Sequence, residues 1–163
     1  MLDLEEYKLP FESFIAGWYI PEHVCDGMIQ YYYEHSKDIT KGVVGGDTET
    51  PIKVDTEIKD SFDLSVSPND RDGCVMAYRI YLDEVLQHYI KKYKYADNNF
   101  YFGVYDDYNI QRYKVGGGFK KWHHERTQPR VSTRHLVFMT YLNDVEDGGT
   151  EFFYQKMITP AKK

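Results

Sequence analysis

The chain has 163 residues, with 20 lysines and arginines against 26 aspartates and glutamates, so its formal net charge is −6. We expect a single domain over residues 1–163, and the acidic balance argues against non-specific binding of nucleic acid. Cys25 and Cys74 are the only cysteines and lie far apart, so neither a disulfide framework nor a zinc ribbon is indicated. The sequence contains neither a long apolar run nor a signal-peptide pattern, so we expect a soluble, cytoplasmic protein without a membrane partner.

Two helices are predicted in the first half of the chain. Pro21 and Glu22 precede apolar residues at helical spacing, which predicts a helix over about residues 22–36. A longer apolar stripe from Tyr78 to Tyr93 predicts a second helix over about residues 73–94. The glycine-rich segment 42–51 predicts a loop, and segment 67–70 predicts a turn.

One strand is predicted in the first half of the chain and several in the second. Residues 58–66 alternate and predict the first of these strands, with Phe62, Leu64 and Val66 on one face and Ser61, Asp63 and Ser65 on the other. After residue 98, short aromatic and β-branched runs predict strands at 101–105, 108–113, 136–142 and 150–154. The predicted class is α+β, with a helical half (1–98) packing on a β-rich half (99–163).

The segment 121–126 reads KWHHER and follows three glycines, 116–118. On a strand, residues two apart point the same way, so His123 and Glu125 would project together while His124 points elsewhere. One imidazole and one carboxylate are two members of the 2-His-1-carboxylate triad, which holds ferrous iron and leaves coordination positions open. Taken alone, the pattern is weak, because clustered polar residues usually lie in a solvated loop.

Hydrolytic sites can be tested against their own spacing. A zinc deaminase also uses H-x-E but needs a P-C-x-x-C further along, and no cysteine follows Cys74. The H-E-x-x-H pattern of the common zinc peptidases does not occur. A nucleophilic pair of cysteine and histidine stays open, although neither cysteine has a supporting local motif.

A longer pattern links the candidate residues. The runs are YNIQRY (108–113), GGGF (116–119), WHHER (122–126), FMTYLNDV (138–145) and DGGTEF (147–152). Together they resemble the iron(II)- and 2-oxoglutarate-dependent dioxygenases of the prolyl 4-hydroxylase type, in the form common in phages and bacteria. The resemblance extends over nearly the whole chain, and its most specific part is the YLNDV and GGT stretch.

The resemblance implies a fold and a set of roles. The fold would be a double-stranded β-helix, a cupin-like jelly roll with N-terminal helices buttressing its major sheet. His123 and Glu125 would be catalytic iron ligands, while Tyr113 and Thr150 would contact 2-oxoglutarate. Fe(II) would be the cofactor, 2-oxoglutarate and O2 the cosubstrates, and ascorbate a candidate reductant. The implied activity is that of an oxidoreductase hydroxylating a C–H bond of a peptide or small molecule, with a prolyl residue as the default substrate.

The chain departs from the family pattern at several points. Glu125 stands where the family usually has Asp, Tyr113 and His123 are one residue further apart than usual, and the stretch before Thr150 is one residue shorter. The resemblance places the second histidine and the basic partner of 2-oxoglutarate after Lys163, so we expect an incomplete barrel in this chain. The alternative is a non-catalytic β-helix fragment that binds a partner chain, or a second copy, through open strand edges.

Overall fold

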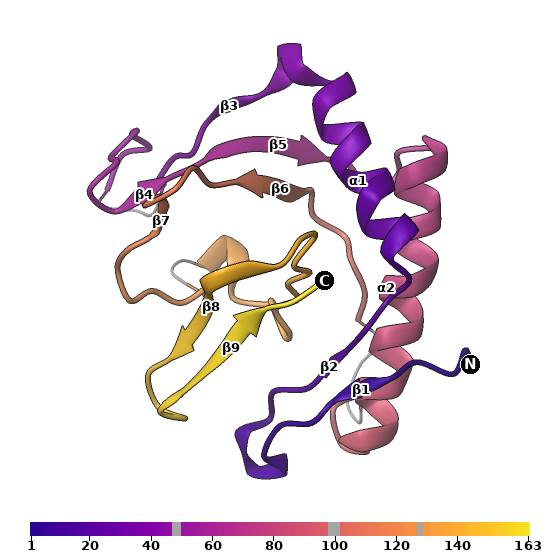
Figure 1. Cartoon of the computed structure of the whole chain (residues 1–163). Helices are drawn as coiled ribbons and strands as arrows, with labels where there is room; N and C mark the ends of the chain where they lie inside the picture. The colour runs from indigo at the N-terminus through magenta and orange to yellow at the C-terminus, as the bar shows by residue number, and fades with distance from the viewer. Residues whose placement is uncertain (47–49, 98–101, 127–128) are drawn as a thin grey trace. The chain divides into compact units, whose positions relative to one another are not determined.

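The computed structural model describes residues 1–46, 50–97, 102–126 and 129–163 (Figure 1). It contains α-helices, 3-10 helices and several small antiparallel sheets, which confirms the α+β class. The chain falls into two compact units, which are taken separately below. The first unit comprises Met1–Tyr31, Asn69–Gly103 and Thr140–Lys163, and the second comprises Tyr32–Pro68 and Val104–Met139. The single domain expected from chain length stays a prediction.

Both predicted helices are confirmed. Helix α1 spans Glu22–Glu34 and helix α2 spans Gly73–Lys92. The side chain of Asp72 caps α2 by accepting a hydrogen bond from the backbone N–H of Cys74 at 2.8 Å. A Cβ atom added at Gly27 would lie 3.3 Å from Sγ of Cys74, so α1 packs closely on the first turn of α2. The buried apolar residues of this unit are Val24, Cys25, Met28, Tyr31, Val75, Tyr78, Tyr93 and Ala161.

The first unit also holds two antiparallel strand pairs. Strand β1 (Glu6–Tyr7) pairs with β2 (Gly17–Trp18), and the 3-10 helix η1 (Phe11–Ser13) lies between them in sequence. Strand β8 (Val145–Phe152) pairs with β9 (Met157–Ala161), with an irregular register between Val145 and Gly149. The strand predicted at 150–154 therefore begins earlier and ends earlier than expected, because residues 153–156 form the turn between β8 and β9.

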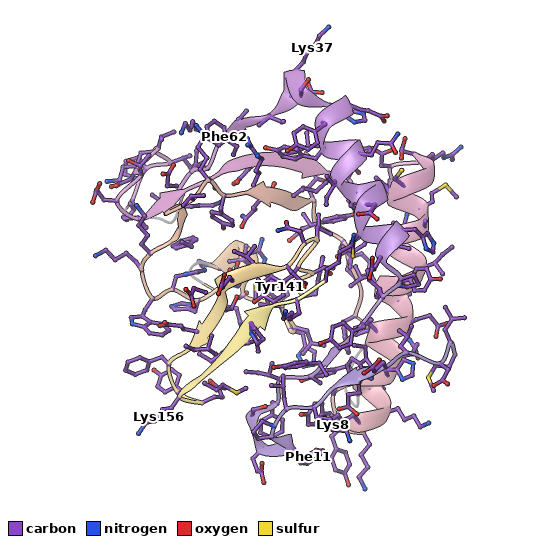
Figure 2. The ribbon with its side chains drawn as sticks, viewed as in Figure 1. Lys8, Phe11, Lys37, Phe62, Tyr141 and Lys156 are labelled. Carbon is purple, nitrogen blue, oxygen red and sulfur yellow. The ribbon has the colours of Figure 1, made fainter. Side chains whose placement is uncertain are left out.

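A three-stranded antiparallel sheet forms the centre of the second unit. Its order is β3 (Thr40–Lys41), β5 (Phe62–Val66) and β6 (Tyr108–Arg112), with Leu64 opposite Ile110. Phe62 (Figure 2) lies under the Nζ atom of Lys41, which is 4.0 Å from the ring centroid. Strand β4 (Lys59–Asp60) pairs with β7 (Gly118–Phe119), and the 3-10 helices are η2 (Ser36–Asp38) and η3 (Pro129–Val131).

The strands predicted at 58–66 and 108–113 are thus confirmed, the first with a break at Ser61 between β4 and β5. The predicted loop at 42–51 is confirmed for its described part, where an isolated bridge joins Val44 to Lys53. Residues 47–49 of that loop lie outside the described residues. The predicted turn at 67–70 is present as a turn at Pro68 and Asn69.

Two strand predictions are wrong, and the strand geometry assumed for the segment 121–126 is absent. Residues 136–142 are irregular, and within the described segments no strand pairs with them. Val137 is 64% and Met139 54% exposed, so this apolar run does not form a covered strand. Residues 102–105 are also irregular, while Tyr101, which opens that prediction, lies outside the described residues. The segment 121–126 that carries the histidines is irregular as well.

Within the described segments, no helix combines the length and the apolarity needed to cross a membrane.

Candidate metal site

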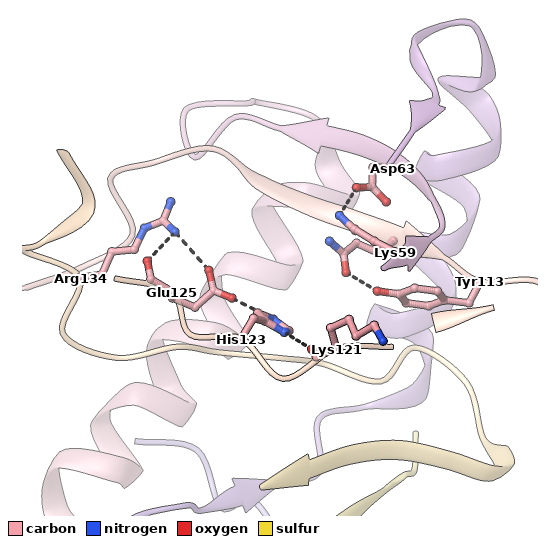
Figure 3. A network of polar contacts seen from close by, with 8 residues as sticks. Lys59, Asp63, Tyr113, Lys121, His123, Glu125 and Arg134 are labelled. Carbon is pink, nitrogen blue, oxygen red and sulfur yellow. Dashed lines mark hydrogen bonds and ion pairs between the residues drawn. The ribbon is translucent and has the colours of Figure 1, made fainter. Parts of the chain in front are cut away.

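His123 and Glu125 meet in the irregular segment that follows β7 (Figure 3). Nε2 of His123 lies 3.6 Å from Oε1 of Glu125. On the other side of the ring, Nδ1 of His123 lies 3.0 Å from the backbone oxygen of Lys121. A carbonyl oxygen can only accept, so Nδ1 carries the hydrogen and Nε2 is the nitrogen presented to the carboxylate. The predicted pairing of these side chains is present, although strand alternation does not produce it.

Phe119 fixes the plane of the His123 ring. The two rings are stacked, with centroids 3.7 Å apart and an interplanar angle of 16°. Phe119 is itself held by strand pairing, because its partner across β4 and β7 is Lys59. The His123 ring is therefore covered on one face by Phe119, which lies on a paired strand, and its Nδ1 atom is bonded to the Lys121 carbonyl. These two contacts leave the imidazole little freedom to turn.

Arg134 holds the other oxygen of Glu125. Its Nη1 atom lies 3.2 Å from Oε2 and 3.4 Å from the backbone oxygen of the same glutamate. Its Nη2 atom lies 3.6 Å from Oδ2 of Asp106. The two carboxylate oxygens of Glu125 therefore have different partners, His123 for one and Arg134 for the other.

These contacts shift the ionisation of both residues. The close approach of the Glu125 carboxylate, 3.6 Å from Nε2, raises the pKa of His123 above its ordinary value, although burial acts in the opposite direction. The same contact with His123 lowers the pKa of Glu125, and the charge of Arg134 acts in the same direction. Without a metal, the pair therefore favours an imidazolium facing a carboxylate.

The imidazole of His123 and the carboxylate of Glu125 have the chemistry and the spacing of two ligands of an iron site. Imidazole and carboxylate are the ligands of the 2-His-1-carboxylate triad for ferrous iron. Two ligands each about 2.1 Å from a metal ion and at right angles to one another are about 3 Å apart. The 3.6 Å between Nε2 and Oε1 can thus be spanned by one ion after a small adjustment. Among the described residues, no three His, Cys, Asp or Glu side chains converge on one metal position.

Tyr113 belongs to the same unit as His123 and Glu125. Its hydroxyl donates a hydrogen bond to Oε1 of Gln111 at 2.7 Å. Tyr113 is 39% exposed, and desolvation of the covered part of its phenol, with a smaller contribution from the Asp63 carboxylate, raises its pKa to about 12. The phenol is therefore a hydrogen-bond donor throughout the physiological range.

The side chains of Lys59 and Asp63 (Figure 3) belong to a buried polar cluster that was not found from the sequence. Nζ of Lys59 is 2.6 Å from Oδ2 of Asp63, and the Ser61 hydroxyl donates to Oδ1 of Asp63 at 2.7 Å. All three residues are buried. The charge of Lys59 makes a minor contribution at the candidate metal site: it adds to the lowering of the pKa of Glu125 and slightly opposes the rise in the pKa of His123. Alternation along 58–66 separated Ser61 and Asp63 from the apolar face but gave no sign of their burial.

Thr150 lies on β8 in the first unit. Its Oγ1 atom accepts a hydrogen bond from the hydroxyl of Tyr141 at 2.7 Å, and that hydroxyl also lies 3.2 Å from Oγ1 of Thr159. Thr159 is the strand partner of Thr150 across β8 and β9. Tyr141 (labelled in Figure 2) thus joins the two threonines of the hairpin. The grouping of Thr150 with Tyr113, His123 and Glu125 stays a prediction.

Comparisons with protein-family models, with curated proteins and with solved structures gave no match to this chain.

Proposed function

We propose that the chain carries iron ligands of an iron(II)- and 2-oxoglutarate-dependent dioxygenase of the prolyl 4-hydroxylase type. The observation that carries the proposal is the approach of Nε2 of His123 to Oε1 of Glu125, within the stretch that resembles the family's iron motif. The anchored Nδ1 adds support, because metal-binding histidines usually donate their second ring N–H to a carbonyl or carboxylate. The proposal includes the jelly-roll fold as the finer form of the α+β class.

In this proposal, His123 and Glu125 hold Fe(II), while Tyr113 and Thr150 bind 2-oxoglutarate. Iron held there would supply open coordination positions and the oxidative chemistry of this enzyme class, in which 2-oxoglutarate and O2 give succinate and CO2 as a C–H bond of the substrate is hydroxylated. Tyr113 is suited to its role because a phenol with a pKa of about 12 remains protonated and donates to an anionic carboxylate. The substrate is a peptide, with a prolyl residue as the default, or a small molecule, and ascorbate would keep the iron reduced.

Metal titration tests the proposal. Mn(II) is a redox-quiet substitute for Fe(II), and the signal of the free ion in electron paramagnetic resonance falls when the ion binds. We expect His123→Ala to abolish specific Mn(II) binding, because it removes one of the two ligands that the pair supplies. His124→Ala is the matched control, since this exposed neighbour carries the same side chain outside the pair. Equal losses from the two substitutions, or binding that survives in His123→Ala, would rule the site out.

A second function is favoured by one observation on the hairpin of the first unit. In the described part of the chain, β8 and β9 form a sheet of only two strands, with Val145 49% and Ile158 61% exposed. Each strand therefore has an edge without a strand partner there, and such edges accept an added strand from another chain. Binding of this kind would be unchanged by His123→Ala and weakened by Ile158→Lys, which places a charge on the hairpin. Analytical ultracentrifugation of the two variants separates this function from the metal site.

A further inference from the structure

The two carboxylate oxygens of Glu125 have different contact partners. Oε1 faces Nε2 of His123 at 3.6 Å. Oε2 is 3.2 Å from Nη1 of Arg134, within hydrogen-bonding distance. The same Nη1 also reaches the backbone oxygen of Glu125 at 3.4 Å, so the guanidinium contacts both the main chain and the side chain of one residue.

This division matters for a metal ligand because a carboxylate can bind a cation through one oxygen or through both. A glutamate side chain is one methylene longer than an aspartate and has one more rotatable bond, so it reaches a second coordination position more easily. Two-oxygen binding would fill a position that the cosubstrates need, since the triad functions by leaving positions open. A donor held on Oε2, the oxygen turned away from His123, would oppose two-oxygen binding.

We propose that Arg134 is a positioning residue that occupies Oε2 of Glu125, so that the glutamate binds the metal through Oε1 alone. The inference rests on the proposed iron site and concerns how that site is held. Arg134 is suited to the task because its planar guanidinium presents several donors in a fixed arrangement. It is held in turn by Asp106, whose Oδ2 lies 3.6 Å from Nη2.

Metal affinity by itself is a poor measure of this role. The positive charge of Arg134 repels a cation, whereas its hydrogen bond orients the ligand, and the two effects on affinity oppose one another. The number of carboxylate oxygens on the metal is the direct measure. It is read from the separation of the two carboxylate stretching bands in the infrared, which is wide for one-oxygen binding and narrow for two-oxygen binding.

The experiment is difference infrared spectroscopy of the full chain with and without Zn(II). The Glu125→Gln spectrum identifies the bands of Glu125, and the protein carries ¹³C-labelled glutamate. We expect the wide separation in the wild type and the narrow one in Arg134→Met, which keeps an unbranched, flexible side chain and removes the guanidinium donors. Arg79→Met is the control, because Arg79 is an exposed arginine on α2 in the first unit. It should give the wild-type spectrum.

A measurement on the unsubstituted chain covers the case in which Arg134→Met fails to fold. In the Zn(II)-loaded protein, NMR should resolve separate Nη signals for Arg134, because the hydrogen bond to Oε2 slows rotation of the guanidinium. A narrow separation in the wild type, an identical spectrum in folded Arg134→Met, or averaged Nη signals would overturn the inference and leave the iron site standing. Failure of the wild type to bind Zn(II) at His123 would overturn both.

Discussion

Lys59 and Asp63 form a buried ion pair, with 2.6 Å between Nζ and Oδ2 and with their side chains only 7% and 10% exposed. Asp63 also accepts from the buried hydroxyl of Ser61, so both of its oxygens are occupied. A Cβ atom added at Gly42 would meet Oγ of Ser61 at 2.2 Å, so the backbone closes over the cluster. In such surroundings a charge depends on its partner, because water cannot replace the contact.

Removing one member of this pair should therefore destabilise the protein strongly. We expect Asp63→Asn to lower the free energy of unfolding by about 3–5 kcal/mol, because it leaves the charge of Lys59 buried without a counter-ion. The double variant Lys59→Met with Asp63→Leu should recover most of that loss, since no charge then remains to be solvated. Urea denaturation followed by circular dichroism measures all three proteins.

The exposed pair of Lys53 and Asp55 is the matched control. Its atoms Nζ and Oδ2 are 2.9 Å apart, but the side chain of Lys53 is 52% exposed. Lys53→Met should therefore change the free energy of unfolding by less than about 1 kcal/mol. A similar loss from Lys53→Met and Asp63→Asn would mean that burial does not set the strength of these pairs.

The cap of α2 gives a prediction for the first unit. Asp72→Ala should lower the free energy of unfolding by about 1 kcal/mol, because the backbone N–H of Cys74 loses its acceptor at the start of the helix. Asp83→Ala removes the same side chain from an exposed position inside α2 and should be neutral or slightly stabilising, because alanine is the better helix former. Chemical denaturation of both variants checks the difference, and equal losses would contradict the capping role.

The sequence predicted the helices well because their signal is local. The apolar stripe that predicts α2 lies within that helix, and the residues that predict the start of α1 lie within a turn or two of its first residue. Both helices begin and end within about two residues of the predicted positions. Strand alternation is different, since a strand also needs a partner. Residues 136–142 have the apolar pattern, yet in the described part of the chain no strand pairs with them.

The candidate site was predictable only in part, for the same reason. His123 and Glu125 do approach one another, but not through the strand alternation used to predict it: the ring of Phe119 and the Lys121 carbonyl orient the histidine in an irregular segment. Arg134 is nine residues from Glu125 across a turn, and no local pattern links them. Contacts of this kind depend on how the chain folds back, which a single sequence does not encode in its periodicity.

Tyr113 should titrate at unusually high pH. Burial and the Asp63 carboxylate both disfavour the phenolate and raise the pKa of Tyr113 to about 12, against about 10 in an unfolded chain. Ultraviolet difference titration of the wild type against Tyr113→Phe isolates its absorbance. Lys59→Met with Asp63→Leu, which removes the carboxylate without leaving a buried charge, should move the titration to lower pH. No change would show that Asp63 does not act on the phenol.

The same shift has a consequence for stability. The folded state binds the Tyr113 proton more tightly than the unfolded state does. The stabilisation that this gives the folded protein is fully present below about pH 10 and is lost as the pH rises through the folded pKa of about 12. Tyr113→Phe cannot ionise. Its stability relative to the wild type should therefore rise above about pH 10, measured as the difference between the two urea midpoints. A constant difference from pH 8 to pH 12 would contradict the shift.

The hydroxyl of Tyr113 should also bind 2-oxoglutarate. In the proposed site it gives up Gln111 as its acceptor and donates to a carboxylate of the cosubstrate, a hydrogen bond worth on the order of 1 kcal/mol net. Tyr113→Phe should therefore weaken 2-oxoglutarate binding to the Mn(II)-loaded chain about fivefold, with Mn(II) affinity unchanged. Tyr105→Phe is the control, because this tyrosine of the same unit is 78% exposed. Calorimetric titration measures both variants, and equal affinities for 2-oxoglutarate in Tyr113→Phe and Tyr105→Phe would remove Tyr113 from the site.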